Sequence, residues 1–122
     1  MTVRTPSCVP SQIWMAESEG RRVLLESEVY ALLAGAGVDV PRHRLVPSPE
    51  AVEPALCEAL GSEEAVVKVA SADLLHKSDV GGLATCRNEP DAVREAAGRV
   101  LAAARGASPS ARIAGALVVE RV

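Results

Sequence analysis

The sequence predicts an α+β fold in which helices pack on a small, mostly antiparallel sheet. Segments with strand character alternate with segments of helical periodicity, and two strand segments lie close together around residues 65–86, as in a hairpin. The composition agrees, because 48% hydrophobic and 24% charged residues are typical of a globular chain. With 122 residues, the chain has the size of one domain.

Three segments have the apolar spacing of helices. The first covers residues 17–37, where glycines mark the end. The second begins with the serine, proline and glutamate of residues 48–50 and ends at Gly61. Pro54 lies inside this segment and predicts either a kink or a helix start delayed to that proline. The third segment begins at residues 88–91 and has the clearest apolar face.

Four segments read as strands. Residues 38–46 form a short extended segment of mixed polarity, and residues 65–70 form a buried strand interrupted by one charge. A polar loop over residues 71–81 connects this strand to a second short strand at 82–86. Residues 113–122 form the last strand, which is expected to run to the end of the sequence.

Charge and aromatic content exclude several classes of partner. The net charge is −3, and the sequence has no polybasic stripe, so neither a nucleic acid nor an anionic membrane is an expected partner. Aromatic residues make up 2% of the chain, which is too few for a base-stacking surface. No run of eighteen apolar residues is present, so no membrane span is expected.

The cysteines and the first residues indicate a compartment. Cys8, Cys57 and Cys86 are odd in number and widely spaced, which predicts free thiols in a reducing environment. Residues 1–16 are expected to form a flexible arm, and they lack the continuous apolar stretch of a signal peptide. The sequence therefore predicts a cytoplasmic protein.

Lysine is rare here, and both lysines lie near the polar loop. The chain has eleven arginines, whereas Lys68 and Lys77 are its only lysines. Alternation along the strand places Lys68 on the face opposite Val67 and Val69, where it needs a cleft or a partner anion. An ammonium reaching phosphate oxygens from a strand fits this position, although chance placement of two lysines is the alternative.

The polar loop has the residue types of a phosphoryl-transfer site. It contains His76 between two aspartates, and it ends in the pair Gly81 and Gly82. Paired glycines let backbone N–H groups approach an anion. A histidine held as one tautomer has a free nitrogen that attacks phosphorus. The alternative is an ordinary solvated loop histidine.

Other nucleotide motifs are absent or ambiguous. Neither a phosphate-binding P-loop pattern nor a dinucleotide glycine pattern is present.

The basic residues 42–44 are expected to be a solvated edge. Glu120 lies in the apolar segment 118–122, and it is either an outward-facing strand residue or a ligand contact.

Three stretches together resemble a known family: residues 25–41, the strand Val67-Lys68-Val69, and the loop 71–82, which contains the letters DLLHKSDVGG. They are similar to the N-terminal portion of the ATP-grasp domain of ADP-forming (NDP-forming) acyl-CoA ligases, of which the acetate–CoA ligase beta subunit is an example. The similarity runs in matching order from about residue 24 to residue 122. It implies an ATP-grasp-like lobe with two to three helices, divided into a helical part 17–61 and a nucleotide-binding lobe 62–122.

The resemblance also implies roles for individual residues. His76 corresponds to the histidine that transiently carries a phosphoryl group, as phosphohistidine, between ATP and the CoA-binding part. Lys68 corresponds to the lysine that holds the nucleotide phosphates, and Glu120 to the hinge position that reads the adenine edge. The residues assigned to ATP or ADP are Lys68, Lys77, Ser78, Gly81, Gly82 and Glu120.

Parts of the family's machinery are not in this sequence. The resemblance implies a second ATP-grasp lobe, whose acidic residues hold Mg²⁺, and a CoA-binding subunit or domain. The metal ligands are therefore expected outside this chain, and none is assigned within it. We expect the chain to be inactive alone and to form a hetero-oligomer if the enzyme is split.

Two alternatives remain open from the sequence. The chain could be a non-catalytic ATP-grasp-like regulatory or interaction module, similar to those fused to acetyltransferases. It could also be a small α+β domain whose strand 113–122 is a bare edge that pairs with a partner.

Overall fold

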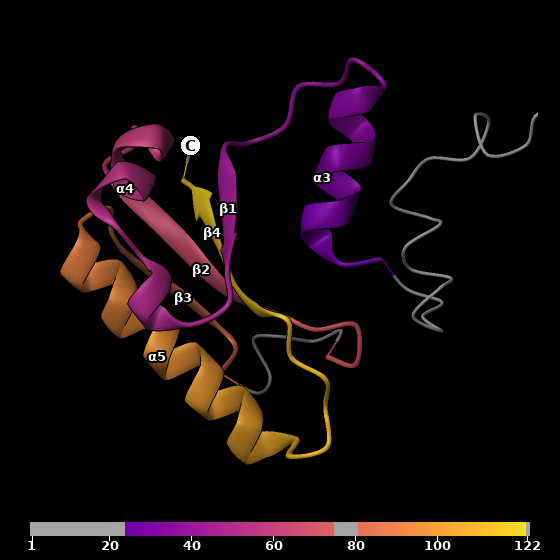
Figure 1. The fold of residues 1–122 in the computed structure, drawn as a ribbon, viewed down its shortest axis with the longest axis vertical. Coiled ribbons are helices and arrows are strands. Elements are labelled where there is room, and N and C mark those ends of the chain that lie inside the picture. Colours follow the sequence, from indigo (N-terminus) through magenta and orange to yellow (C-terminus); the bar gives the residue numbers. More distant parts are fainter. Residues whose placement is uncertain (1–23, 75–80, 122) are drawn as a thin grey trace, which may run out of the picture. The chain divides into compact units, whose positions relative to one another are not determined.

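The computed structural model describes residues 24–74 and 81–121, and it divides into two compact units, residues 1–40 and 41–122 (Figure 1). The first unit contains α3 (Glu26–Gly35). Glu28 begins this helix by accepting the Leu25 backbone N–H at 2.7 Å. The predicted helix 17–37 is therefore shorter in the described residues, and residues 17–23 lie outside them. The Tyr30 hydroxyl donates to Glu26 at 2.6 Å, and burial together with this bond raises the pKa of Tyr30 to about 12.

The second unit contains a four-stranded antiparallel sheet. Its strands are β1 (His43–Val46), β2 (Glu64–Ala70), β3 (Leu83–Arg87) and β4 (Gly115–Glu120), in the order β1-β4-β2-β3. The predicted α+β class and the hairpin of β2 and β3 are confirmed. The alternative of a bare edge strand at 113–122 is wrong, because β4 pairs with β1 on one side and β2 on the other. In the described residues this strand ends at Glu120, and Val122 lies outside them.

Three helical segments of the second unit lie on one side of the sheet. They are the 3₁₀ turn η1 (Pro49–Ala51), α4 (Pro54–Leu60) and α5 (Pro90–Ala107), and α5 runs across the sheet face (Figure 1). The delayed start at Pro54 is confirmed, since Val52 and Glu53 are extended and separate η1 from α4. Gly61 ends α4 with a positive φ of 71°, a conformation that glycine adopts at little cost.

Small side chains from α5 and from the sheet form the core between them. Close approach of backbones compensates for the lack of large aromatic side chains. The buried residues of α5 are Val93, Ala96, Ala97, Val100, Leu101 and Ala104. They form one cluster with residues of all four strands, of which Val46, Val67, Val69 and Val118 are buried and Ala84 and Cys86 are partly buried.

Among the described glycines, Gly115 has the least room for a side chain, and this gives a prediction about stability. Its φ is +147°, and a Cβ added there would lie 2.1 Å from the Val46 carbonyl oxygen. We expect Gly115→Ala to lower the free energy of unfolding by about 2–4 kcal/mol, because neighbouring backbone must move. Gly98→Ala within α5 is the control. Its Cβ would meet only Pro49 at 3.9 Å, so a gain of about 0.5–1 kcal/mol is expected. Equal losses in a urea titration would contradict this account.

Candidate functional site

Lys68 lies on the sheet face opposite α5. Val67 and Val69 are fully buried in the core cluster, whereas Lys68 between them is half-buried. Alternation along β2 therefore places the Lys68 side chain on the other face, as the sequence predicts. Lys68 therefore lies outside the core cluster that contains Val67 and Val69.

Lys68 belongs to a row of four residues that crosses the sheet. The strand register pairs Lys68 with Leu83 on β3 and with Leu117 on β4, and Leu117 with Leu45 on β1. Residues directly opposite in antiparallel strands point to the same side. We call these four residues the Lys68 row. It places one cationic side chain among three leucines, of which Leu45 and Leu83 are exposed and Leu117 is buried.

The polar loop is described only at its two ends. His76, Lys77 and Ser78 lie outside the described residues. At the first end, Leu74 is buried in the core cluster. At the second end, Gly81 has a φ of +73°, and its added Cβ would lie 3.2 Å from the Ala103 Cβ on α5.

Gly82 continues the β-sheet pairing. Its carbonyl oxygen accepts the Val69 backbone N–H at 2.8 Å, and the residue itself is buried. This carbonyl therefore extends the hairpin of β2 and β3 by one hydrogen bond. The two glycines stand where the loop rejoins the sheet, at the same end of β2 as Lys68.

Three residues fasten the first end of the loop, and we call them the stem clamp. The Ser71 hydroxyl donates to the Arg112 carbonyl at 2.5 Å and accepts the Asp73 N–H at 3.2 Å. The Asp73 carboxylate accepts the Arg112 backbone N–H at 2.7 Å and two guanidinium N–H groups at 3.2 Å each. These bonds to Arg112 hold the pKa of Asp73 below its usual value.

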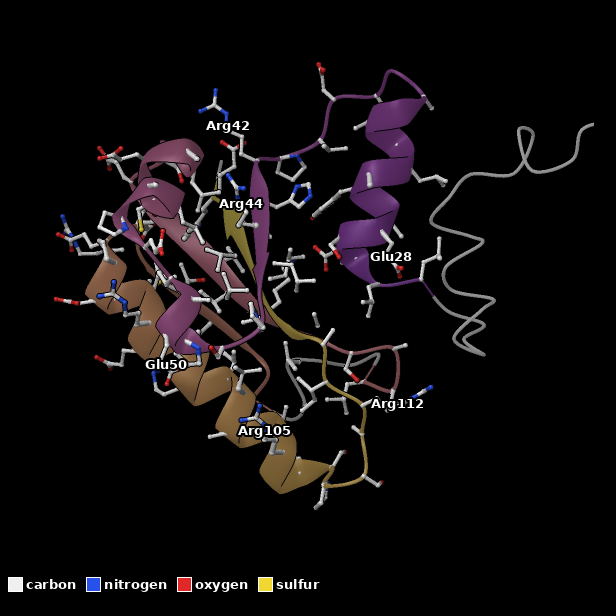
Figure 2. The ribbon with its side chains drawn as sticks, in the orientation of Figure 1. Glu28, Arg42, Arg44, Glu50, Arg105 and Arg112 are labelled. Carbon is white, nitrogen blue, oxygen red and sulfur yellow. The ribbon has the colours of Figure 1, made fainter. Side chains whose placement is uncertain are left out.

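Sequence reasoning missed the stem clamp. Asp73 counted only as one of two loop aspartates, and Arg112 was one arginine among eleven. The two residues are 39 positions apart, so no local pattern connects them. They meet because the segment before β4, where Figure 2 labels Arg112, lies beside the end of β2.

Glu120 lies away from the Lys68 row. It pairs with Ala65, and alternation along β4 puts it on the face of Val118, opposite Leu117. Its Oε2 accepts the Arg42 backbone N–H at 2.5 Å, and its own N–H donates to the Arg42 carbonyl at 2.9 Å. The carboxylate thus fastens the start of β1 to the end of β4.

The basic residues 42–44 lie at the start of the edge strand β1, which begins at His43. Arg42 and Arg44 are exposed, and Figure 2 shows both beside β1. The Nδ1 atom of His43 lies 2.9 Å from the Pro41 carbonyl oxygen. This placement agrees with the predicted solvated edge.

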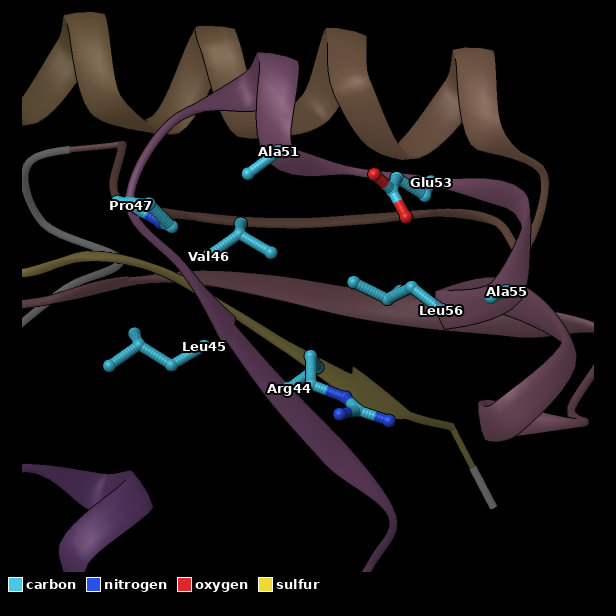
Figure 3. A pocket seen from close by; sticks show the side chains of 8 residues that line it. All are labelled: Arg44, Leu45, Val46, Pro47, Ala51, Glu53, Ala55 and Leu56. Carbon is cyan, nitrogen blue, oxygen red and sulfur yellow. The ribbon is translucent and has the colours of Figure 1, made fainter.

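A pocket of about 280 Å³ lies between β1 and the segment from η1 to α4, and sequence reasoning did not find it. Figure 3 shows the Arg44 guanidinium and the Glu53 carboxylate on different sides of it. None of the sequence-predicted site residues lines this pocket. Its other lining residues are Leu45, Val46, Pro47, Ala51, Ala55 and Leu56.

Thiol and metal chemistry find little support in the described residues. Cys57 and Cys86 are free thiols, and burial raises the pKa of both, which favours the unreactive thiol form. Cys8 lies outside the described residues. Within 24–74 and 81–121, no group of three or more histidine, cysteine or acidic side chains could hold a metal ion. No helix in this part of the chain is long and apolar enough to span a membrane.

Comparison with known proteins identifies relatives of this fold. A family model described as ATP-grasp domain matches residues 15–122. A dinucleotide-forming acetyl-coenzyme A synthetase 1 of Ca. Korarchaeum cryptofilum, solved with coenzyme A, Ca-AMPCP and HgCl⁺, is 30% identical, with a TM-score of 0.81. The alignment covers 92% of this chain and 48% of the synthetase chain.

Other solved structures agree. A second structure of the Korarchaeum protein, in complex with coenzyme A, is 29% identical, has a TM-score of 0.80, and covers 92% of this chain and 47% of that chain. PH1788 from Pyrococcus horikoshii, at 24% identity with a TM-score of 0.79 and coverage of 92% and 47%, supports the fold alone. No curated protein sequence matches the chain. The chain spans about half the length of these solved proteins.

Proposed function

The chain belongs to the ATP-grasp family, and from this premise we propose that it is the ATP-binding part of an ADP-forming acyl-CoA ligase. Such an enzyme converts a carboxylate, CoA and ATP into acyl-CoA, ADP and phosphate. Similarity to acetyl-coenzyme A synthetase structures over 92% of the chain supports this reaction class.

The Lys68 row is the observation that carries the proposal. A nucleotide combines a flat apolar base with an anionic phosphate chain, and the row combines leucine side chains with one ammonium. Lys68 would bind phosphate oxygens as a compact point charge, and the exposed Leu83 paired with it would contact the apolar part of the nucleotide. The row also lies at the end of β2 from which the polar loop departs.

We assign the phosphoryl relay to His76 from its place in the loop sequence. The unprotonated imidazole nitrogen attacks the γ-phosphorus of ATP, the bond to the bridging oxygen breaks, and ADP leaves. A phosphohistidine then passes the group to a histidine in the CoA-binding part. Lys77, Ser78, Gly81 and Gly82 would stabilise the phosphate oxygens with an ammonium, a hydroxyl and backbone N–H groups.

For Glu120 we propose a supporting role at the hinge. Its carboxylate binds the Arg42 N–H, and its strand position is on the face opposite Lys68. We therefore propose that it fixes the end of β4, while the backbone beyond β4 meets the adenine edge.

Further parts are needed for turnover under this proposal. The chain spans about half of the matched synthetases, so we propose a remaining ATP-grasp lobe and a CoA-binding part as partners. Mg²⁺ would neutralise charge on the transferred phosphate when bound. The described residues do not fit a metal site, so no step of the reaction is assigned to a metal held by them.

Reconstitution tests the proposal directly. The assembled ligase is this chain combined with the remaining ATP-grasp lobe and the CoA-binding part. We expect ATP-dependent acyl-CoA formation from the assembled ligase. This chain alone, and the other parts without this chain, should give only background formation. ADP and phosphate should appear in equal amounts. Nucleotide binding without any acyl-CoA formation would favour the non-catalytic module instead.

A further inference from the structure

We propose that Asp73 and Arg112 are positioning residues for phosphoryl transfer, because the stem clamp fixes the point from which the chain reaches His76. The inference rests on the proposed function of His76. It adds a role for two residues that lie outside the nucleotide site. The two residues bind each other, so each would act through the loop.

The clamp holds both the backbone and the side chains of the stem. Ser71, which is only 4% exposed, connects the stem to the Arg112 carbonyl. One residue earlier, the Ala70 carbonyl accepts the Ala114 N–H at 2.8 Å, which continues the pairing of β2 with β4. The stem is therefore fastened to the segment before β4 over consecutive residues.

Asp73 completes the clamp with a directional contact. Its carboxylate receives three N–H groups of one residue, Arg112, and a forked guanidinium fixes orientation as well as distance. The next residue, Leu74, is buried in the core cluster, and Ala111 and Ile113 pack against that cluster. The chain direction at residue 74 is thus set by polar contacts and by core packing together.

His76 is three residues after Asp73. Three residues of chain span at most about 11 Å, which is the longest distance that can separate the two Cα atoms. Phosphoryl transfer depends on alignment, and a misplacement of about 1 Å can cost a hundredfold in rate. Because residues 71–74 are held in place, only the residues between Leu74 and His76 can add to such a misplacement on this side of the loop.

The ion pair between Asp73 and Arg112 is too exposed to add much to stability. The side chains of Arg112 and Asp73 are 64% and 33% exposed, and exposed ion pairs contribute little to the free energy of unfolding. The lowered pKa of Asp73 means that its contribution is present above the usual carboxyl pKa and is lost as the pH falls through the lowered value. Around neutral pH the clamp is therefore fully formed.

The test measures three quantities on the assembled ligase: the rate of His76 phosphorylation, the Kd of ATP, and the melting temperature. We expect Asp73→Asn to slow phosphorylation about tenfold to a hundredfold. The Kd should stay within about twofold, and the melting temperature within about 2 °C. Arg112→Gln should give a smaller loss, because its backbone N–H still donates to Asp73, and the double variant should be no slower than Asp73→Asn.

The control variant is Asp91→Asn. Asp91 forms an exposed ion pair with Arg94 at 3.0 Å at the start of α5, far along the chain from the loop. It should leave the phosphorylation rate unchanged. If His76 is phosphorylated equally fast in the wild type and in Asp73→Asn, the positioning role is overturned and the proposed function stands. If the wild type carries no phosphate on His76, the proposed function fails, and the positioning role fails with it.

Discussion

Replacing His76 by alanine is expected to reduce acyl-CoA formation by the assembled ligase about 10³-fold or more. The imidazole would form the covalent phosphoryl intermediate, and the remaining positioned groups cannot supply a nucleophile in its place. Binding of ATP should change little, because the imidazole does not hold the nucleotide in the ground state. The measurement is the steady-state rate of ATP-dependent acyl-CoA formation together with the Kd of ATP.

The chain offers a matched control for this variant. His43 is the only other histidine, and it lies on the edge strand β1 with its Nδ1 near the Pro41 carbonyl. We expect His43→Ala to keep the rate within about threefold, because His43 lies on the edge strand and is not assigned to the reaction. Full activity in His76→Ala would remove the relay from the account.

Replacing Lys68 by alanine is expected to weaken ATP binding about tenfold to a hundredfold. A charge-assisted contact to phosphate from a half-buried position contributes about 1.5–3 kcal/mol. Lys68→Arg should not restore binding fully, because the wider guanidinium fork needs different geometry. Calorimetry on the assembled ligase measures the Kd.

Arg99→Ala is the matched control for charge. Arg99 is an exposed residue of α5, paired with Glu95 at 3.9 Å on the other side of the sheet. It removes the same charge as Lys68→Ala, so equal weakening in both variants would indicate a general charge effect. A Kd unchanged by Lys68→Ala would contradict the assignment of the Lys68 row to the nucleotide.

Local patterns predicted the elements of the second unit well. The period of two along β2 placed Lys68 opposite Val67 and Val69, and the buried face of α5 followed the spacing of three and four. The delayed helix start at Pro54 also follows from local chemistry, because proline favours the first turn and disfavours the interior.

The order of the strands could not be predicted in the same way. β4 is the last strand in the sequence, yet in the sheet it lies between β1 and β2. Its apolar run from Ala116 to Val119 carried the signal, because strands buried on both faces read as continuous apolar sequence. Interpreted that way, the segment would have been expected at the centre of the sheet and not at an edge.

Some parts of the candidate site could be predicted from local sequence, and others could not. The loop letters between Asp73 and Gly82 and the lysine on β2 are local, so the sequence alone indicated them. The Lys68 row and the stem clamp depend on register across strands and on a contact over 39 residues. Such contacts follow from the packing of the whole unit, which no window of sequence contains.

The location of the phosphate tests the central claim most directly. The assembled ligase is mixed with ATP labelled in its γ-phosphate, quenched at alkaline pH, where phosphohistidine survives, and digested for mass spectrometry. We predict that the label is found on the peptide that contains His76 and is absent from that peptide in His76→Ala. Turnover with no label on the His76 peptide at any time point would contradict the account.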